Sequence, residues 1–182
     1  MITFVSLLLI NSGCSRSNQF EKSCLNILDI FTKTAQLVVV TEARNDMGVN
    51  GKVDSTNGLL DISKAKEYLN SKKNELTKNY EIIKSSFDQK NEKYYDALFV
   101  LAFVNDQLYR YSGQPIEDPC IYFKIIKGKQ NLKMSNWIKD EFFGRFIYKK
   151  NTINSWNQMD KETKSSMIYK LLLIPGGSSE RC

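Results

Sequence analysis

The chain of 182 residues contains no histidine, and this absence removes much of enzyme chemistry. Ser-His-Asp and Cys-His catalytic systems need an imidazole base, and imidazole is a common zinc ligand. The sequence also lacks a nucleotide-binding glycine loop, a Cys-x-x-Cys pair and a Gly-x-Ser-x-Gly turn. We therefore expect no cofactor and no histidine-dependent catalysis.

Arginine is scarce as well, since only five of the 26 basic residues are arginine. Nucleic-acid recognition favours arginine, whose guanidinium group binds bases and phosphates through two hydrogen bonds, and the chain has no dense arginine cluster. Beyond the N-terminus the sequence has no apolar run of 18 residues or more. The scarcity of arginine argues against a nucleic-acid-binding protein, and the absence of long apolar runs excludes a protein with several membrane spans.

Helical periodicity runs through most of the chain. Apolar residues recur at three-residue and four-residue steps in five segments, 18–44, 62–87, 91–111, 135–149 and 155–173. Segment 91–111 is apolar all round at its centre, which predicts a buried central helix. Residues 121–126 fit a short strand or a buried helical turn. The sequence predicts one all-α domain over 19–175, an irregular bundle of about five helices with a possible strand or hairpin near 121–133.

The segment from Asp46 to Asn57 partly matches a calcium-binding EF-hand loop. Asp46 and Asp54 fall at the first and ninth loop positions. Gly48 stands at the third position and Asn57 at the twelfth, so two of the required oxygen ligands are missing. We interpret the segment as a turn-rich connection between helices and expect no metal site.

The first 13 residues, MITFVSLLLINSG, form an uncharged apolar segment. It is too short for a permanent membrane span, but its length suits the apolar part of a secretory signal. Ser12 and Gly13 are small residues that suit a processing site directly before Cys14. The alternative is that this stretch packs into the core of the domain.

The residues Asn11-Ser12-Gly13-Cys14 resemble the lipobox of bacterial lipoproteins. The resemblance implies that Cys14 receives a diacylglyceryl group and becomes the first residue of the mature protein. Residues 1–13 are then the signal peptide and 14–18 a tether. Independently of the resemblance, the run Pro175-Gly176-Gly177-Ser178-Ser179 predicts a flexible tail over 176–182. Ser15 after the cysteine favours sorting to the outer membrane, so the resemblance implies a domain anchored by lipid on the periplasmic face.

Export would expose the three remaining cysteines to an oxidising compartment. Cys24 lies near the start of the first predicted helix, and Cys120 directly follows a proline turn. Both are expected at ordered positions, whereas Cys182 ends a Gly-Ser tail. A disulfide needs Cα atoms within about 7 Å, so we predict Cys24–Cys120. The alternative is a bond from Cys182 that attaches the tail to the domain.

The stretch 121–156 is rich in both aromatic and basic residues. Its aromatic residues fit the core better than a binding groove, but its basic residues are candidates for a binding surface: Lys124, Lys127, Lys129, Lys133, Lys139, Arg145, Lys149 and Lys150. Such a surface would suit an acidic protein partner. We therefore expect a lipid-anchored protein-interaction module, either an assembly factor or an immunity-type inhibitor of a toxin.

The alternative function is a cell-envelope enzyme that hydrolyses glycans with two carboxylates. The candidate pairs are Asp140 with Glu141 and Glu117 with Asp118. Adjacent residues on a helix point in different directions, and Glu117 and Asp118 lie in a turn bounded by prolines. An enzyme of this type requires a cleft in which carboxylates converge, whereas an interaction module requires an exposed docking patch.

Overall fold

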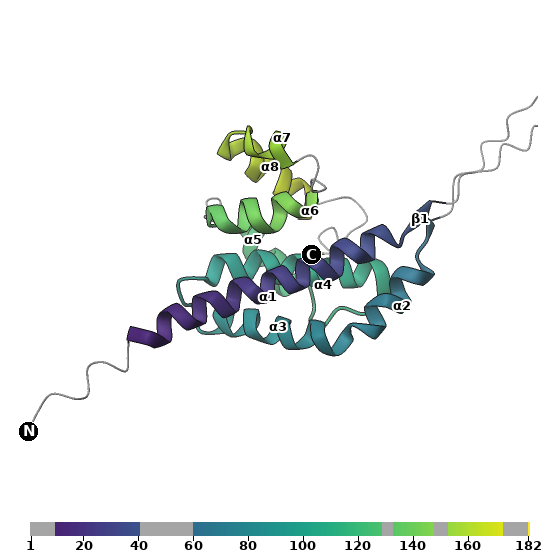
Figure 1. The fold of residues 1–182 in the computed structure, drawn as a ribbon, viewed down its shortest axis with the longest axis horizontal. Helices are drawn as coiled ribbons and strands as arrows, with labels where there is room; N and C mark the ends of the chain where they lie inside the picture. Colours follow the sequence, from purple (N-terminus) through teal and green to yellow (C-terminus); the bar gives the residue numbers. More distant parts are fainter. Residues whose placement is uncertain (1–9, 41–59, 129–132, 148–152, 173–181) are drawn as a thin grey trace, which may run out of the picture.

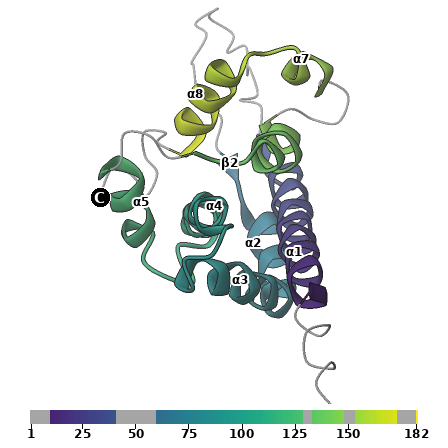
Figure 2. The ribbon, with the colours of Figure 1, turned by 90° about the vertical axis from the view of Figure 1, so that its left-hand side faces the viewer.

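The computed structural model describes residues 10–40, 60–128, 133–147, 153–172 and Cys182, and this part of the chain is all-α. Its helices are α1 (Ile10–Gln36), α2 (Ser63–Ser71), α3 (Lys73–Asp88), α4 (Tyr94–Ser112), α5 (Cys120–Gly128), α6 (Arg145–Ile147), α7 (Ile153–Asn157), α8 (Lys161–Leu172) and the π-helix η1 (Ile138–Gly144). Figure 1 shows α4 from the side, and Figure 2 looks along it and shows other helices arranged around it. None of the described helices is long and apolar enough to cross a membrane.

Helix α4 is the central helix, as its sequence predicts. Every residue from Asp96 to Leu108 is buried. Phe103 lies at the centre of an aromatic cluster, and its ring centroid is between 4.7 and 5.8 Å from those of Phe31, Phe142, Phe143 and Phe146. All four ring pairs meet edge to face, the arrangement that the ring quadrupole favours. These contacts join α1, α4, η1 and α6 into one core.

The interpretation of the aromatic residues in 121–156 as core is confirmed for most of them. Tyr122, Phe123, Phe142, Phe143 and Trp156 are fully buried. Gly144 lies directly against the indole of Trp156, and a Cβ atom at that position would come within 2.6 Å of the indole nitrogen. A glycine is therefore required for η1 to pack against α7.

The described residues form eight α-helices rather than the predicted five, because two predicted helices are divided and α5 is an additional helix. The helix expected over 62–87 is divided at Lys72, which has φ −98° and ψ 3° and whose amide donates to the carbonyls of Tyr68 and Leu69. The helix expected over 155–173 becomes α7 and α8. Asp160 begins α8, since its carboxylate accepts hydrogen bonds from the amides of Glu162 and Thr163. Hydrogen bonds from Thr163 lower the pKa of Asp160.

The first helix is displaced from its expected range of 18–44. It begins at Ile10, so the segment 14–18 that was expected as a tether is helical, and it ends at Gln36. Beyond it, β1 (Val39–Val40) pairs antiparallel with β2 (Leu60–Asp61). Branching at Cβ favours extended backbone, which explains why the valine run leaves the helix. Residues 46–57, the partial match to a calcium loop, lie outside the described residues.

Of the two alternatives for 121–126, the buried helical turn is present, since 120–128 form α5, and the possible strand or hairpin near 121–133 is absent from the described residues. Pro119 lies before its first turn, and Asp118 caps it by accepting a hydrogen bond of 3.0 Å from the amide of Cys120. Upstream, Gly113 ends α4 with φ 71°, a left-handed conformation that glycine adopts without strain. The segment 113–119, with its glycine and two prolines, therefore separates α4 from α5.

The predicted Cys24–Cys120 disulfide is wrong, and the alternative bond from Cys182 is the one present. Cys120 and Cys182 are joined, with Cα atoms 5.1 Å apart. Cys24 is a free thiol without solvent exposure inside the core face of α1. Burial raises the pKa of the Cys24 thiol, which keeps it protonated. The spacing of the cysteines along the sequence does not indicate that Cys182, the last residue of the expected tail, is bonded to the first residue of α5.

Candidate functional site

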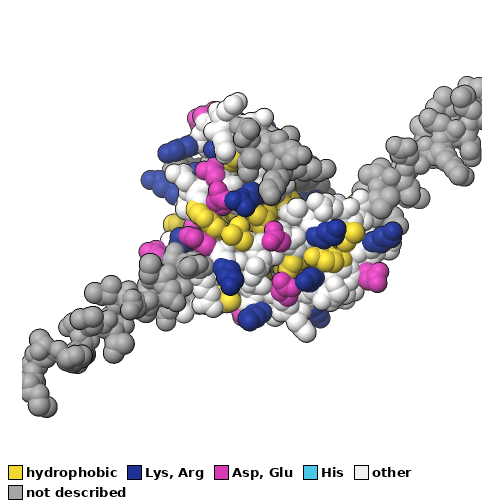
Figure 3. Space-filling model, viewed as in Figure 1, with side chains coloured by type: hydrophobic (Ala, Val, Ile, Leu, Met, Phe, Trp, Pro, Cys, Tyr) yellow, Lys and Arg dark blue, Asp and Glu magenta, His cyan; other side chains and the backbone are white. Residues whose placement is uncertain are grey.

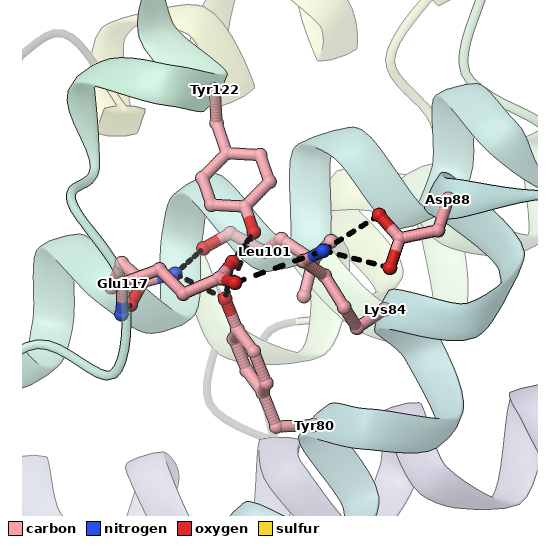
Figure 4. Close-up of polar contacts among 7 residues, drawn as sticks. Tyr80, Lys84, Asp88, Leu101, Glu117 and Tyr122 are labelled. Carbon is pink, nitrogen blue, oxygen red and sulfur yellow. Dashed lines mark hydrogen bonds and ion pairs between the residues drawn. The ribbon is translucent and has the colours of Figure 1, made fainter.

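A cluster of hydrogen-bonded polar side chains joins α3, α4 and α5 in the described part of the chain and is here called the Glu117 clamp. It consists of Tyr80 from α3, Asn105 from α4, Glu117 from the segment between α4 and α5, and Tyr122 from α5 (Figure 4). Glu117 is one of the carboxylates that the sequence marks as a candidate for catalysis.

The carboxylate of Glu117 accepts a hydrogen bond from each tyrosine. The Tyr80 hydroxyl donates to Oε2 at 2.8 Å, and the Tyr122 hydroxyl donates to the same oxygen. The two hydroxyls are 2.9 Å apart. The other oxygen, Oε1, lies 3.7 Å from the ammonium group of Lys84. Figure 4 shows the carboxylate between the two phenol rings, with Lys84 reaching it from α3.

Asn105 completes the clamp from the central helix. Its amide nitrogen donates to the Tyr80 hydroxyl and to the carbonyl of Leu101, both at 2.9 Å, and its amide oxygen accepts the backbone N–H of Glu117 at 2.9 Å. Asn105 has no solvent exposure. Buried polar groups are stable only when they are hydrogen-bonded, and here both ends of the amide have partners.

The protonation of the clamp is fixed by its surroundings. Burial raises the pKa of Tyr80 and of Tyr122 above that of a free phenol, so both remain hydrogen-bond donors at physiological pH. The pKa of Lys84 is also raised, chiefly by its hydrogen bonds to Asp88 at 2.6 and 2.8 Å. The Glu117 carboxylate therefore faces two permanent donors and one cation, an arrangement that suits holding the loop before α5 in place rather than transferring protons.

A stability prediction follows from this geometry. Glu117→Ala removes the acceptor of two buried hydroxyls, and we expect the free energy of unfolding to fall by about 2 kcal/mol. Glu117→Gln keeps one acceptor oxygen and should cost about half as much. Urea denaturation monitored by circular dichroism measures both. A change below about 0.5 kcal/mol for Glu117→Ala would contradict the clamp, and Glu141→Ala, which breaks an exposed ion pair, serves as the control.

The other predicted carboxylates have separate partners and do not converge. Asp118 is exposed and caps α5. Asp140 accepts hydrogen bonds of 2.9 Å from the indole nitrogen of Trp156 and from the ammonium group of Lys164. Glu141 forms an ion pair with Arg145 on the next turn. Within the described residues, no group of three or more Cys, Asp or Glu side chains is placed to hold a metal ion.

The eight basic residues expected to form a binding surface are divided between elements. Lys124 and Lys127 lie on α5, whereas Lys139 lies on η1 and Arg145 on α6. Figure 2 shows α5 and α6 on different sides of α4. Lys133 is exposed just before η1, and Lys129, Lys149 and Lys150 lie outside the described residues. On the face shown in Figure 3, basic and acidic side chains are interspersed.

A groove of about 330 Å³ lies near the clamp and was not anticipated from the sequence. The side chains of Leu69, Leu76, Leu108, Pro115 and Ile116 supply its apolar lining. Lys73 is the one charged residue among those that line it. These residues come from α2, α3, α4 and the segment held by the clamp, so no single periodic pattern could have indicated the groove.

Compared with known protein families, with curated proteins and with solved structures, the chain shows no significant similarity to any of them. Its site must therefore be interpreted from its own geometry.

Proposed function

We propose that the protein is a lipid-anchored, periplasm-facing interaction module that binds an acidic, partly apolar segment of a protein partner. The observation that carries the proposal is the apolar groove with Lys73 as its charged lining residue. Apolar centres with a charged or polar rim are typical of protein-binding surfaces. Identification of the partner distinguishes the two functions. A toxin as partner would make the module an immunity-type inhibitor, and a component of a protein assembly would make it an assembly factor.

Exposed residues close in sequence to the clamp support the same proposal. Ile116 is 36% exposed, and Ile121 on the first turn of α5 is 49% exposed, the highest value among the described large hydrophobic residues. Lys124 is exposed one turn further along α5. The clamp and the Cys120–Cys182 disulfide both hold this corner in place. A preorganised surface loses less conformational entropy when it binds.

Three features support the anchor and the compartment. The first is the resemblance of residues 11–14 to a lipobox. The second is that the described α1 residues in the core lie between Phe20 and Phe31, so removal of residues 1–13 leaves these contacts intact. The start of α1 also projects beyond the neighbouring helices (Figure 1). The third is the disulfide, since disulfides form in oxidising compartments.

The anchor predicts a modification at Cys14. We expect mass spectrometry of the membrane fraction to find a mature chain that begins at diacylated Cys14. Cys14→Ser should release the domain from the membrane without unfolding it, because a lipid chain contributes about 0.8 kcal/mol of membrane binding for each buried methylene. Ser15→Ala is the control and should remain at the membrane. Recovery of an intact Met1 or of an unmodified Cys14 thiol would contradict the proposal.

The groove predicts where the partner binds. A photo-crosslinking amino acid at Ile116 should give one discrete protein adduct in cells, whereas the same group at exposed Lys33 on α1 should give none. Lys73→Glu should reduce the Ile116 adduct about tenfold, since like charges across an interface are repulsive. Lys33→Glu is the matched charge reversal and should leave it unchanged. An adduct at Ile116 that is insensitive to Lys73→Glu would contradict an acidic partner in the groove.

The alternative function, a carboxylate-dependent glycan hydrolase, receives no support from the two candidate pairs. Glu117 is held by two phenols, Asp118 by a helix N-terminus, Asp140 by an indole and a lysine, and Glu141 by an arginine. None of these four residues lines the groove with Lys73 or the larger cleft between α1 and α3.

A further inference from the structure

A second cleft, of about 520 Å³, lies between α1, α3 and the turn that joins α3 to α4. One wall is a stripe on α3 in which four-residue steps join Glu81 to Ser85 and Ile82 to Ser86, since residues four positions apart are neighbours on a helix surface. Glu92 closes the end from the turn. This cleft shares no lining residue with the groove of the proposed function.

The uncompensated charge of the cleft is negative. Glu81 and Glu92 are exposed, and neither has an ion-pair or hydrogen-bond partner in the part of the chain that the structure describes. Lys93 also lines the cleft, but its ammonium group is already engaged. It lies 3.7 Å from a carboxylate oxygen of Glu21 and 5.9 Å from the centre of the Phe20 ring. Two carboxylates therefore remain for a ligand.

Ser86 provides a second and independent indication of a ligand. Only 8% of its surface is exposed, and it lines the cleft. Its hydroxyl has no hydrogen-bond partner among the described residues. The hydroxyl is not shut off from solvent, so it offers the cleft a donor and an acceptor that the fold itself does not use.

We propose that this cleft binds a primary ammonium group carried on an aliphatic chain. An ammonium group has three donors and no acceptor, which matches two carboxylates and a hydroxyl. The methylene chain would lie along Ile82, which is half-buried in the α3 wall. Two sources share this chemistry, a small free diamine and a lysine side chain of a partner protein. The proposal does not depend on the partner groove or on the lipid anchor.

The test uses the mature full-length chain labelled with ¹⁵N and titrated with 1,5-diaminopentane. We expect saturable shifts of the amide signals around Ser86 and Glu92, and no saturable shifts with 1,5-pentanediol, which has the same length but no charge. Glu81→Gln with Glu92→Gln should weaken binding about tenfold. The matched control replaces exposed carboxylates elsewhere, Asp29→Asn with Glu67→Gln, and should bind as the unaltered protein does.

Ser86→Ala tests the hydroxyl separately and should weaken binding about threefold while the melting temperature is retained. Nα-acetyl-lysine methylamide distinguishes the sources. Binding as tight as that of the diamine indicates a lysine side chain, and much weaker binding indicates a free diamine. Three results would overturn the proposal: no saturable shift, equal binding of the diol, or unchanged affinity in the Glu81→Gln, Glu92→Gln variant.

Discussion

Replacement of Phe103 by alanine is expected to lower the free energy of unfolding by about 4 kcal/mol, the largest effect that we predict for a single residue. Phe103 has no solvent exposure and meets four other phenylalanine rings from three elements. Truncation loses the transfer free energy of the ring and leaves a cavity that aromatic neighbours fill poorly. Native domains are stable by only about 5 to 15 kcal/mol, so the variant should be visibly destabilised.

Urea denaturation followed by circular dichroism measures this effect. Phe103→Leu is the matched control and should cost about 1.5 kcal/mol, since it keeps most of the volume but none of the ring contacts. A loss below about 1.5 kcal/mol for Phe103→Ala would contradict the central place of this residue. It would mean that the surrounding rings can close over the space.

Removal of the Cys120–Cys182 disulfide is expected to have a similar effect. The bond joins residues 62 positions apart. In the chain-entropy model a loop of this size stabilises the folded state by about 4 kcal/mol, because the crosslink restricts the unfolded chain. Cys120→Ser with Cys182→Ser should therefore unfold at a much lower urea concentration. The slope of the transition should also rise, since the unfolded chain without the crosslink exposes more surface.

Reduction provides an internal check on this prediction. A reducing agent should destabilise the unaltered protein to the level of the double serine variant and should leave that variant unchanged. Cys24→Ala, which removes the buried free thiol, should not alter the response to reductant. A peptide map of the oxidised protein that joins Cys24 to another cysteine would contradict the structure. Three free thiols in periplasmic material would also weaken the proposal of export.

The two cysteine positions show what a single sequence can and cannot predict. Cys24 and Cys120 were both expected at ordered positions, and both are ordered. Whether two ordered cysteines are neighbours depends on packing between helices. Cys24 lies on the buried face of α1 and Cys120 begins α5, and Figure 2 shows these two helices on different sides of α4. Cys182 forms the bond with Cys120 instead.

The sequence by itself determined the all-α class, the central buried helix, the break at Gly113 and the aromatic core. Each of these follows from local chemistry: the spacing of apolar residues over a few turns, and the backbone limits of glycine and proline. The helices predicted over 62–87 and 155–173 are interrupted at Lys72 and between Asn157 and Lys161. Neither break contains a glycine or a proline, so the sequence carries no signal for them.

Only the tertiary structure decided which polar residues meet. Tyr80 and Tyr122 lie 42 positions apart, yet their hydroxyls are 2.9 Å apart and share one carboxylate oxygen. The groove with Lys73 and the cleft with Glu81 and Glu92 likewise combine residues from three or more segments. The physical reason is that periodicity records which side of a helix is buried, whereas a site depends on the distances between helices, which are set by the packing of the whole core.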